Sequence, residues 1–128
     1  MRDNDAVARF LGVVIDAVTP GRARARMTVT SKMLNGHGMA HGGLVFTLAD
    51  TAFAYACNTD GSPTVARQCE IAFMRPAQLG DALVAVAELR SRVGRNGIYD
   101  VRVSRADGEL VAEMRGHSAT LTRTEIPR

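Results

Sequence analysis

The sequence predicts an α+β fold in which an antiparallel sheet of six strands wraps around one long central helix. Two observations carry this prediction. Residues 43–57 form one long segment that is apolar nearly all round when drawn as a helix, and six other stretches have the composition of strands separated by turn residues. Such a helix must be enclosed by other elements, and a curled antiparallel sheet can enclose it.

Length and composition indicate one globular domain, residues 1–128. Hydrophobic residues make up 46% of the chain and charged residues 23%, which is typical of a protein with a packed core. No apolar run is long enough to span a membrane and the N-terminus lacks the apolar segment of a signal peptide, so we expect a cytoplasmic protein without membrane association. The net charge of +3 does not indicate nucleic-acid binding. Two cysteines are too few for a disulfide framework, so Cys57 and Cys69 are expected to be reduced core thiols.

The chain should begin with a short helix over residues 3–11, capped by Asp3 or Asn4. Three of its apolar residues fall on one face: Val7, Phe10 and Leu11. Residues 12–19 then predict a strand that ends at the turn dipeptide Pro20-Gly21.

The segment RARARMTVT, residues 22–30, predicts a half-buried strand with an arginine face. Small or apolar side chains alternate in it with arginine and threonine. The following NGHGMAHGG, residues 35–43, holds four glycines in nine positions, which predicts a loop with unusual backbone angles or with close approach of a ligand.

The central helix is expected from Gly43 to Cys57, with Asn58, Asp60 and Gly61 ending it. Four strands should follow, over residues 64–74, 82–90, 97–105 and 109–121, and Asp107-Gly108 marks a tight hairpin between the last two. An open sheet of this kind leaves strand edges unpaired, which favours pairing with a second chain.

Asp50 is the feature of the central helix that most needs an explanation. It shares a stripe at helical spacing with Thr47, Thr51 and Ala54, while the other faces carry apolar side chains. Asp50 is either a solvated residue on a narrow polar stripe or a carboxylate placed at a site, as a base or a nucleophile.

The start of the same helix offers a second group. The N–H groups of Gly42 and Gly43 lack intrahelical partners, and no side chain blocks approach to them. Together with the positive end of the helix dipole they could stabilise an oxyanion, although the glycines could also serve only the turn into the helix.

Distance along the helix links the two features. Asp50 lies eight residues after Gly42, which corresponds to about 12 Å at 1.5 Å per residue. The carboxylate therefore cannot act on a carbonyl held by its own helix. An antiparallel helix from a second chain would bring Asp50 of one protomer to Gly42 of the other, which predicts a two-fold dimer with two composite sites.

These residues carry a family resemblance. The segment NGHGMAHGGLVFTLADTAFAYAC resembles the signature of hot-dog-fold acyl-CoA thioesterases, in particular the phenylacetate-degradation type that acts on phenylacetyl-CoA. The flanking LGVVI, VTPGRARARM and IAFMRPAQLGDALVAVAEL also resemble the family. A relative that acts on dihydroxynaphthoyl-CoA typically has Glu where this chain has Asp50, which favours the phenylacetate type.

The resemblance implies hydrolysis of an aryl-acyl-CoA, of the phenylacetyl-CoA or hydroxyphenylacetyl-CoA class, by a homodimer that pairs again into a homotetramer. Asp50 corresponds to the catalytic carboxylate, as general base or nucleophile, and Gly42 to the residue whose N–H polarises the thioester carbonyl. Asn35 corresponds to an amide that positions the carbonyl or the water, His41 to the site histidine, and Thr51 to a hydroxyl near the attacking group. No cofactor is implied, because CoA is part of the substrate.

Three arginines are candidates for binding the phosphates of CoA: Arg67, Arg75 and Arg95. Surface arginines are more often simply solvated. No metal site is predicted, because glycines make a helix through His37 and His41 improbable and no third ligand is evident. Cys57 has no histidine placed as its partner and the chain has no GxSxG motif, which disfavours cysteine and serine hydrolases.

Two other functions stay open at this point. Hot-dog dehydratases or hydratases use a histidine with a carboxylate, and His41 keeps that alternative alive. A non-catalytic acyl-CoA-binding module is the other, and it would make the carboxylate dispensable.

Overall fold

The computed structural model describes residues 5–126, and its elements follow the predicted order. A short helix precedes two strands, a long helix and four further strands: α1 (Ala6–Leu11), β1 (Val14–Thr19), β2 (Arg22–Thr28), α2 (Gly42–Cys57), β3 (Thr64–Phe73), β4 (Ala82–Val93), β5 (Asn96–Arg105) and β6 (Leu110–Thr120). The main differences from the predicted bounds are in the strands: β1 begins two residues later, β2 ends two residues earlier and β4 ends three residues later, whereas α2 begins one residue earlier.

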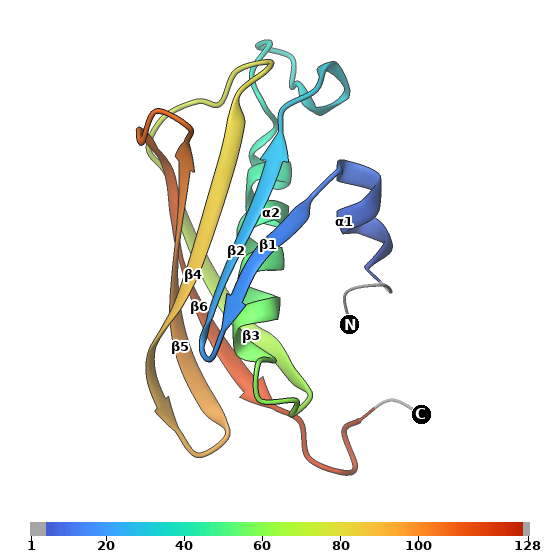
Figure 1. Cartoon of the computed structure of the whole chain (residues 1–128), viewed down its shortest axis with the longest axis vertical. Coiled ribbons are helices and arrows are strands. Elements are labelled where there is room, and N and C mark those ends of the chain that lie inside the picture. The colour runs from blue at the N-terminus through green and yellow to red at the C-terminus, as the bar shows by residue number, and fades with distance from the viewer. Residues whose placement is uncertain (1–4, 127–128) are drawn as a thin grey trace.

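The strands form one six-stranded sheet in the order β1-β2-β4-β5-β6-β3, and all neighbours are antiparallel. Figure 1 shows the strands curling around α2, with α1 lying beyond β1. The predicted α+β fold, an antiparallel sheet around one long helix, is therefore confirmed. The sheet ends in two open edges, β1 and β3.

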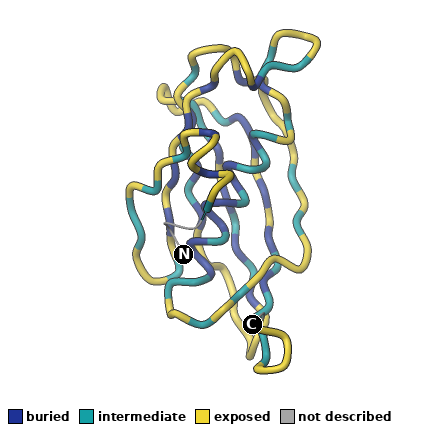
Figure 2. Tube along the Cα trace, turned by 90° about the vertical axis from the view of Figure 1, so that its right-hand side faces the viewer, coloured by how far each residue is buried: buried dark blue, intermediate teal, exposed yellow. Residues whose placement is uncertain are grey.

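The core lies between α2 and the inner face of the sheet. In β2 the predicted alternation is confirmed, since Ala23, Ala25 and Met27 are buried and the arginines between them are exposed. Figure 2 shows the buried segments in the middle of the molecule and the exposed ones in the loops at its ends. Helix and sheet approach closely at Gly116, where an added Cβ would lie 2.7 Å from the ring of Phe53, so that position has no room for a side chain.

The N-terminal helix differs from its prediction in two respects. Its first predicted residues and both predicted caps, Asp3 and Asn4, lie outside the described residues. Within them Asp5 is the N-cap, and its Oδ1 accepts a hydrogen bond of 3.0 Å from the N–H of Ala8. The helix docks through Ala8 and Leu11, so Val7 and Phe10 are exposed although they share a face with Leu11.

One stripe of α2 is not fully covered by the sheet. Thr47, Asp50 and Ala54 are half-buried, whereas their neighbours Leu48, Ala49 and Ala52 are completely buried. Asn58 ends the helix, as predicted, and joins it to β3, because its amide donates to the carbonyl oxygen of Thr64 and accepts from the N–H of the same residue. Over residues 5–126, no helix combines the length and apolar character that crossing a membrane requires.

Candidate active site

Asp50 is half-buried at the middle of α2. Its carboxylate makes no hydrogen bond or ion pair with any residue between 5 and 126. Burial raises the pKa of Asp50, and the nearby carboxylate of Asp5 raises it further. Such a carboxylate does not stabilise the folded chain. This favours the interpretation of Asp50 as a site residue over its interpretation as a solvated surface residue.

The N-terminus of α2 leaves one backbone donor free. His41 is the N-cap, and its ring Nδ1 accepts a hydrogen bond of 3.1 Å from the N–H of Gly43. The carbonyl oxygen of His41 accepts from the N–H of Leu44 at 2.9 Å. Among the described residues the N–H of Gly42 has no acceptor, so this amide is the one available to a ligand.

The hydrogen bond from the N–H of Gly43 also determines the tautomer of the neutral His41 ring. A nitrogen that accepts from an N–H carries no proton, so in the neutral ring the proton is on Nε2. His41 therefore caps the helix with one nitrogen and offers a donor with the other.

Asn35 shapes the loop that leads to His41. Its side-chain Oδ1 accepts from the N–H groups of His37 at 2.9 Å and of Met39 at 3.2 Å. Because two backbone donors need an oxygen there, the amide nitrogen Nδ2 is the free end of the side chain. Asn35 thus keeps a donor for a ligand while it holds the glycine-rich loop closed.

Thr51 lies next to Asp50 but has its proton engaged. The residue is buried, and its Oγ1 donates a hydrogen bond of 2.7 Å to the carbonyl oxygen of Thr47 one turn earlier. Any further role of this hydroxyl is therefore that of an acceptor.

An apolar cavity of about 290 Å³ adjoins Gly42. Phe73 at the end of β3, the following Met74 and Val45 of α2 line it. The sequence analysis did not single out this cavity. The apolar segment IAFM directly before Arg75-Pro76 could have indicated apolar residues near the site. Which of them face Gly42 depends on how the strand ends, and the sequence pattern does not show this.

The three candidate arginines do not form one cluster. Arg67 donates to the side chain of Asn96, and Arg95 pairs with Glu125, so these two lie at one end of the sheet. Hydrogen bonds from Thr122 lower the pKa of Glu125, and the charges of both arginines lower it further. Arg75 lies at the other end of β3, beside the apolar cavity, where it pairs with Glu109. Arg67 and Phe73 are six residues apart on β3, or roughly 20 Å. The arginines at the two ends of β3 in one protomer therefore cannot bind the same phosphate.

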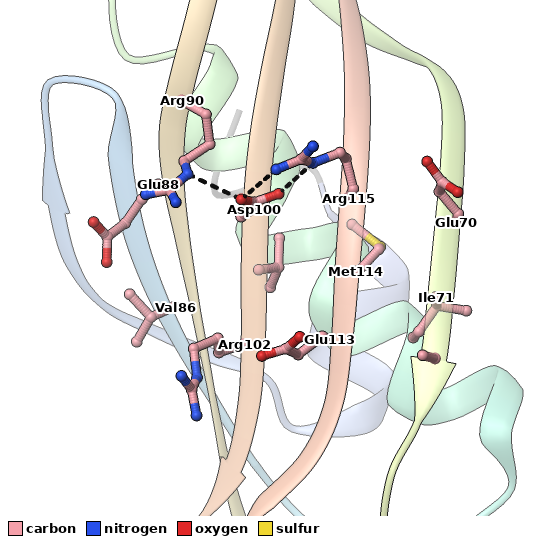
Figure 3. Close-up of a pocket in the computed structure, with 12 residues that line it drawn as sticks. Glu70, Ile71, Val86, Glu88, Arg90, Asp100, Arg102, Glu113, Met114 and Arg115 are labelled. Carbon is pink, nitrogen blue, oxygen red and sulfur yellow. Dashed lines mark hydrogen bonds and ion pairs between the residues drawn. The ribbon is translucent and has the colours of Figure 1, made fainter.

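A second, larger hollow of about 730 Å³ lies on the face of the sheet turned away from α2 (Figure 3). At its centre Asp100 accepts two hydrogen bonds from Arg115, at 2.7 and 2.8 Å, and pairs with Arg90 at 2.9 Å. The hydrogen bonds from Arg115 lower the pKa of Asp100. Its charge is satisfied, and the hollow contains neither Asp50 nor Gly42, so we place the site at α2.

The two cysteines are free thiols, as predicted, but only Cys57 is buried, while Cys69 is half-buried. Burial raises the pKa of Cys57 to about 12, which makes a thiolate nucleophile unfavourable.

Comparisons with known proteins identify relatives of the chain. The family model of the thioesterase superfamily matches residues 37–112. The chain is 48% identical to the acyl-coenzyme A thioesterase PaaI of Escherichia coli (strain K12) over 118 residues, covering 92% of this chain and 84% of that protein. The residues that the family model matches include most of the glycine-rich loop, α2 and the strands β3, β4 and β5, while Asn35, β1 and β2 precede them.

Two solved structures are informative. The E. coli PaaI protein from the phenylacetic acid degradation operon superposes with a TM-score of 0.94 at 46% identity, covering 95% of this chain and 88% of that one. A hypothetical thioesterase of Streptococcus pneumoniae TIGR4, solved with coenzyme A, superposes with a TM-score of 0.86 at 25% identity, covering 91% of each chain.

Proposed function

The chain belongs to the thioesterase superfamily, and from this premise we propose that it hydrolyses acyl-CoA thioesters with Asp50 as the catalytic carboxylate. The observation that carries the proposal is a pair of groups on α2 that have no hydrogen-bond partner among residues 5–126: the half-buried carboxylate of Asp50 and the N–H of Gly42. Thioester hydrolysis needs an activated water or a nucleophile, together with charge stabilisation on the carbonyl oxygen.

In the proposed mechanism the thioester oxygen accepts a hydrogen bond from the N–H of Gly42, at the positive end of the helix dipole. Nδ2 of Asn35 and the Nε2–H of His41 are further donors at this end of α2. Asp50 either takes a proton from the water that attacks the carbonyl carbon or attacks that carbon itself. With Asp50 as the base, the carbon–sulfur bond then breaks, the thiolate of CoA leaves and takes the proton from Asp50, and the free acid remains. With Asp50 as the nucleophile, departure of the thiolate leaves the acyl group bonded to Asp50 as a mixed anhydride. Water then hydrolyses the anhydride to the free acid and the Asp50 carboxylate, and a proton from that water goes to the thiolate.

We further propose that each site is built from two protomers. Because Asp50 and Gly42 of one helix are about 12 Å apart, two antiparallel helices must be offset so that Asp50 of each meets Gly42 of the other. The two-fold axis then passes near residue 46, midway between them. Phe46 is a half-buried apolar residue that such a crossing would cover.

The edge strand β3 is the proposed line of contact between protomers. It is ten residues long, is open on one side and ends at the cavity beside Gly42. In an antiparallel pair of β3 strands, the Arg67 end of one protomer approaches the Arg75 end of the other, which would bring together arginines that one chain keeps apart. Pairing of two dimers into a tetramer stays a prediction, and a measurement of the mass of the protein in solution tests it.

For the acyl group we propose the aryl-acyl class, phenylacetyl-CoA or a hydroxyphenylacetyl-CoA. Support comes from the PaaI relative of the phenylacetic acid degradation operon and from the small size of the apolar cavity. We propose a role in phenylacetate catabolism without a cofactor, in the cytoplasm, where a reducing environment would suit the two free thiols.

The decisive experiment measures thiol release from a panel of aryl- and alkyl-acyl-CoAs by the wild type and by Asp50→Asn. We expect turnover of the aryl-acyl thioesters by the wild type and a loss of ~10²-fold or more in Asp50→Asn. Asp16→Asn is the matched control, because it removes a carboxylate whose ion pairs lie on the outer strands, and we expect activity within about 2-fold of the wild type.

Three other outcomes would separate the alternatives. Binding of acyl-CoA without turnover would indicate a binding module. Addition of water to an enoyl-CoA without thiol release would indicate a hydratase. Full activity of Asp50→Asn on thioesters would leave the hydrolysis standing but remove Asp50 from it.

A further inference from the structure

Phe73 is an aromatic residue placed directly against the free amide of α2. It is the last residue of β3 and is 54% exposed, although it shares a strand face with Cys69 and Ile71, which pack on the core. A Cβ added to Gly42 would lie 3.2 Å from Cζ of its ring. The ring therefore rests on the backbone of Gly42, beside the N–H that has no acceptor among the described residues.

The cavity beside this ring has a lining that suits an uncharged group. Its walls are mainly apolar, with Met39, Val45, Met74 and Val111 beside Phe73. The one charged residue that lines it is Arg75, whose guanidinium donates to the carbonyl oxygen of Leu110 at 3.0 Å and pairs with Glu109 at 3.2 Å. At about 290 Å³ the cavity is at the lower limit of typical ligand pockets, roughly 300 Å³, so it could hold a fragment and not a whole nucleotide-bearing thioester.

We propose that this cavity takes the acyl group of the substrate and that Phe73 determines which acyl groups fit. The inference rests on the proposed function, in which the N–H of Gly42 holds the carbonyl oxygen. A carbonyl held there has two substituents, the sulfur of CoA and the acyl group. The apolar one gains by leaving water for the cavity, and the phosphate-bearing one gains by staying outside it.

The position of the ring selects for shape as well as for size. A flat aromatic acyl group can stack on Phe73 or meet its ring edge to face, whereas a long alkyl chain would extend beyond the cavity. Phe73 is thus a specificity-determining residue, and the acyl groups favoured are aromatic or short.

The test compares kcat/KM for phenylacetyl-, hexanoyl- and decanoyl-CoA in the wild type, Phe73→Ala and Phe73→Trp. For Phe73→Ala we expect the ratio of decanoyl to phenylacetyl activity to rise about 10-fold or more, because the wall of the cavity is removed. For Phe73→Trp we expect that ratio to fall, with hexanoyl-CoA still hydrolysed. Phe10→Ala is the matched control, since it makes the same change at an exposed ring on α1 that does not line the cavity, and its ratios should equal those of the wild type.

Two results would overturn the proposal, and they are distinguishable from each other. If Phe73→Ala hydrolyses all three thioesters with the same proportional change, Phe73 does not contact the acyl group, and the acyl-pocket inference fails while the proposed function stands. If the wild type hydrolyses none of the three, the proposed function and the inference fail together. Circular dichroism checks folding, and Phe73→Leu, which keeps an apolar side chain at this exposed position, repeats the comparison if Phe73→Ala does not fold.

Discussion

At the scale of single residues, the charged form of Asp50 destabilises the folded chain. Its carboxylate is half-buried, has no partner among residues 5–126, and lies near a second carboxylate, that of Asp5. Both surroundings disfavour the charged form, which is why the pKa is raised. Residues that oppose stability in this way are expected where function needs them.

We predict that Asp50→Asn is more stable than the wild type at neutral pH. The unfolded carboxyl has an ordinary pKa, and the folded one has a raised pKa, so ionisation favours the unfolded state. The wild type should therefore lose stability as the pH rises from the ordinary value through the raised one. The difference between the two proteins should be largest above the raised pKa and vanish below the ordinary pKa.

Urea unfolding at equal protein concentrations over this pH range measures the difference. If the variant is less stable than the wild type at neutral pH, the carboxylate has a stabilising partner and our account of Asp50 is wrong. The same raised pKa should move the acid limb of the kcat/KM profile to higher pH than an ordinary aspartate would give, if Asp50 reacts in its charged form.

At the scale of the element, the N-terminus of α2 divides its donors between structure and ligand. The ring of His41 takes the N–H of Gly43, and the carbonyl oxygen of His41 takes that of Leu44. Only the N–H of Gly42 is left among these three, and it lies beside the cavity under Phe73. The cap thus selects which amide can meet a substrate.

This division can be tested by removing one N–H. Gly42 is the first residue of α2, where proline is tolerated, and the preceding His41 has the extended backbone (φ −62°, ψ 130°) that proline favours. We predict that Gly42→Pro lowers kcat by about 10²- to 10³-fold, the usual effect of losing one oxyanion donor.

Gly42→Ala is the matched control for that variant. It adds the same Cβ next to the ring of Phe73, at 3.2 Å, but keeps the N–H. It should lose less than ~10-fold, because the exposed ring can shift slightly. Equal losses in the two variants would mean that steric crowding and not the N–H is responsible.

At the scale of the whole molecule, the two groups that the proposed mechanism uses lie too far apart on one chain to act on the same carbonyl. Asp50 lies at the middle of α2 and the free N–H at its start, about 12 Å away. An enzyme that uses both groups on one carbonyl must therefore combine two chains. This is a stronger statement than dimerisation alone, because it says which residue each chain contributes.

We predict that a heterodimer of Asp50→Asn with Gly42→Pro is active although both parent homodimers are nearly inactive. One of its two sites joins the intact Asp50 of one chain to the intact Gly42 of the other, so it should show about half of the wild-type kcat. Co-expression with two affinity tags isolates the heterodimer, and thiol release measures its activity.

The reciprocal heterodimer distinguishes the two possible arrangements. In wild type paired with the double variant Asp50→Asn/Gly42→Pro, every composite site contains one altered residue, so we expect almost no activity. If each chain instead carried a complete site, this second heterodimer would keep half of the activity and the first would have none.

The sequence alone determined the order of the elements and the distance between Asp50 and Gly42 along the helix. Alternation in β2, the apolar character of α2 and the turn at Asp107-Gly108 are local patterns, and the structure reproduces them. The separation of Asp50 and Gly42 is also a local quantity, because helix geometry fixes it. The catalytic assignment and the three arginines came from family resemblance, and they stay predictions.

Only the tertiary structure decided which groups are occupied and what surrounds them. The hydrogen bonds from Gly43 to His41 and from Thr51 to Thr47 are local, but the structure shows which side-chain conformations make them. The contact of Phe73 with Gly42 is an outcome of packing. The separation of Arg75 from the Arg67 end follows from the length of β3, and the exposure of Phe10 from the way α1 docks through Ala8 and Leu11. The contact of Phe73 with Gly42 and the docking of α1 depend on residues far apart in the chain, whose distances no local pattern of side chains encodes.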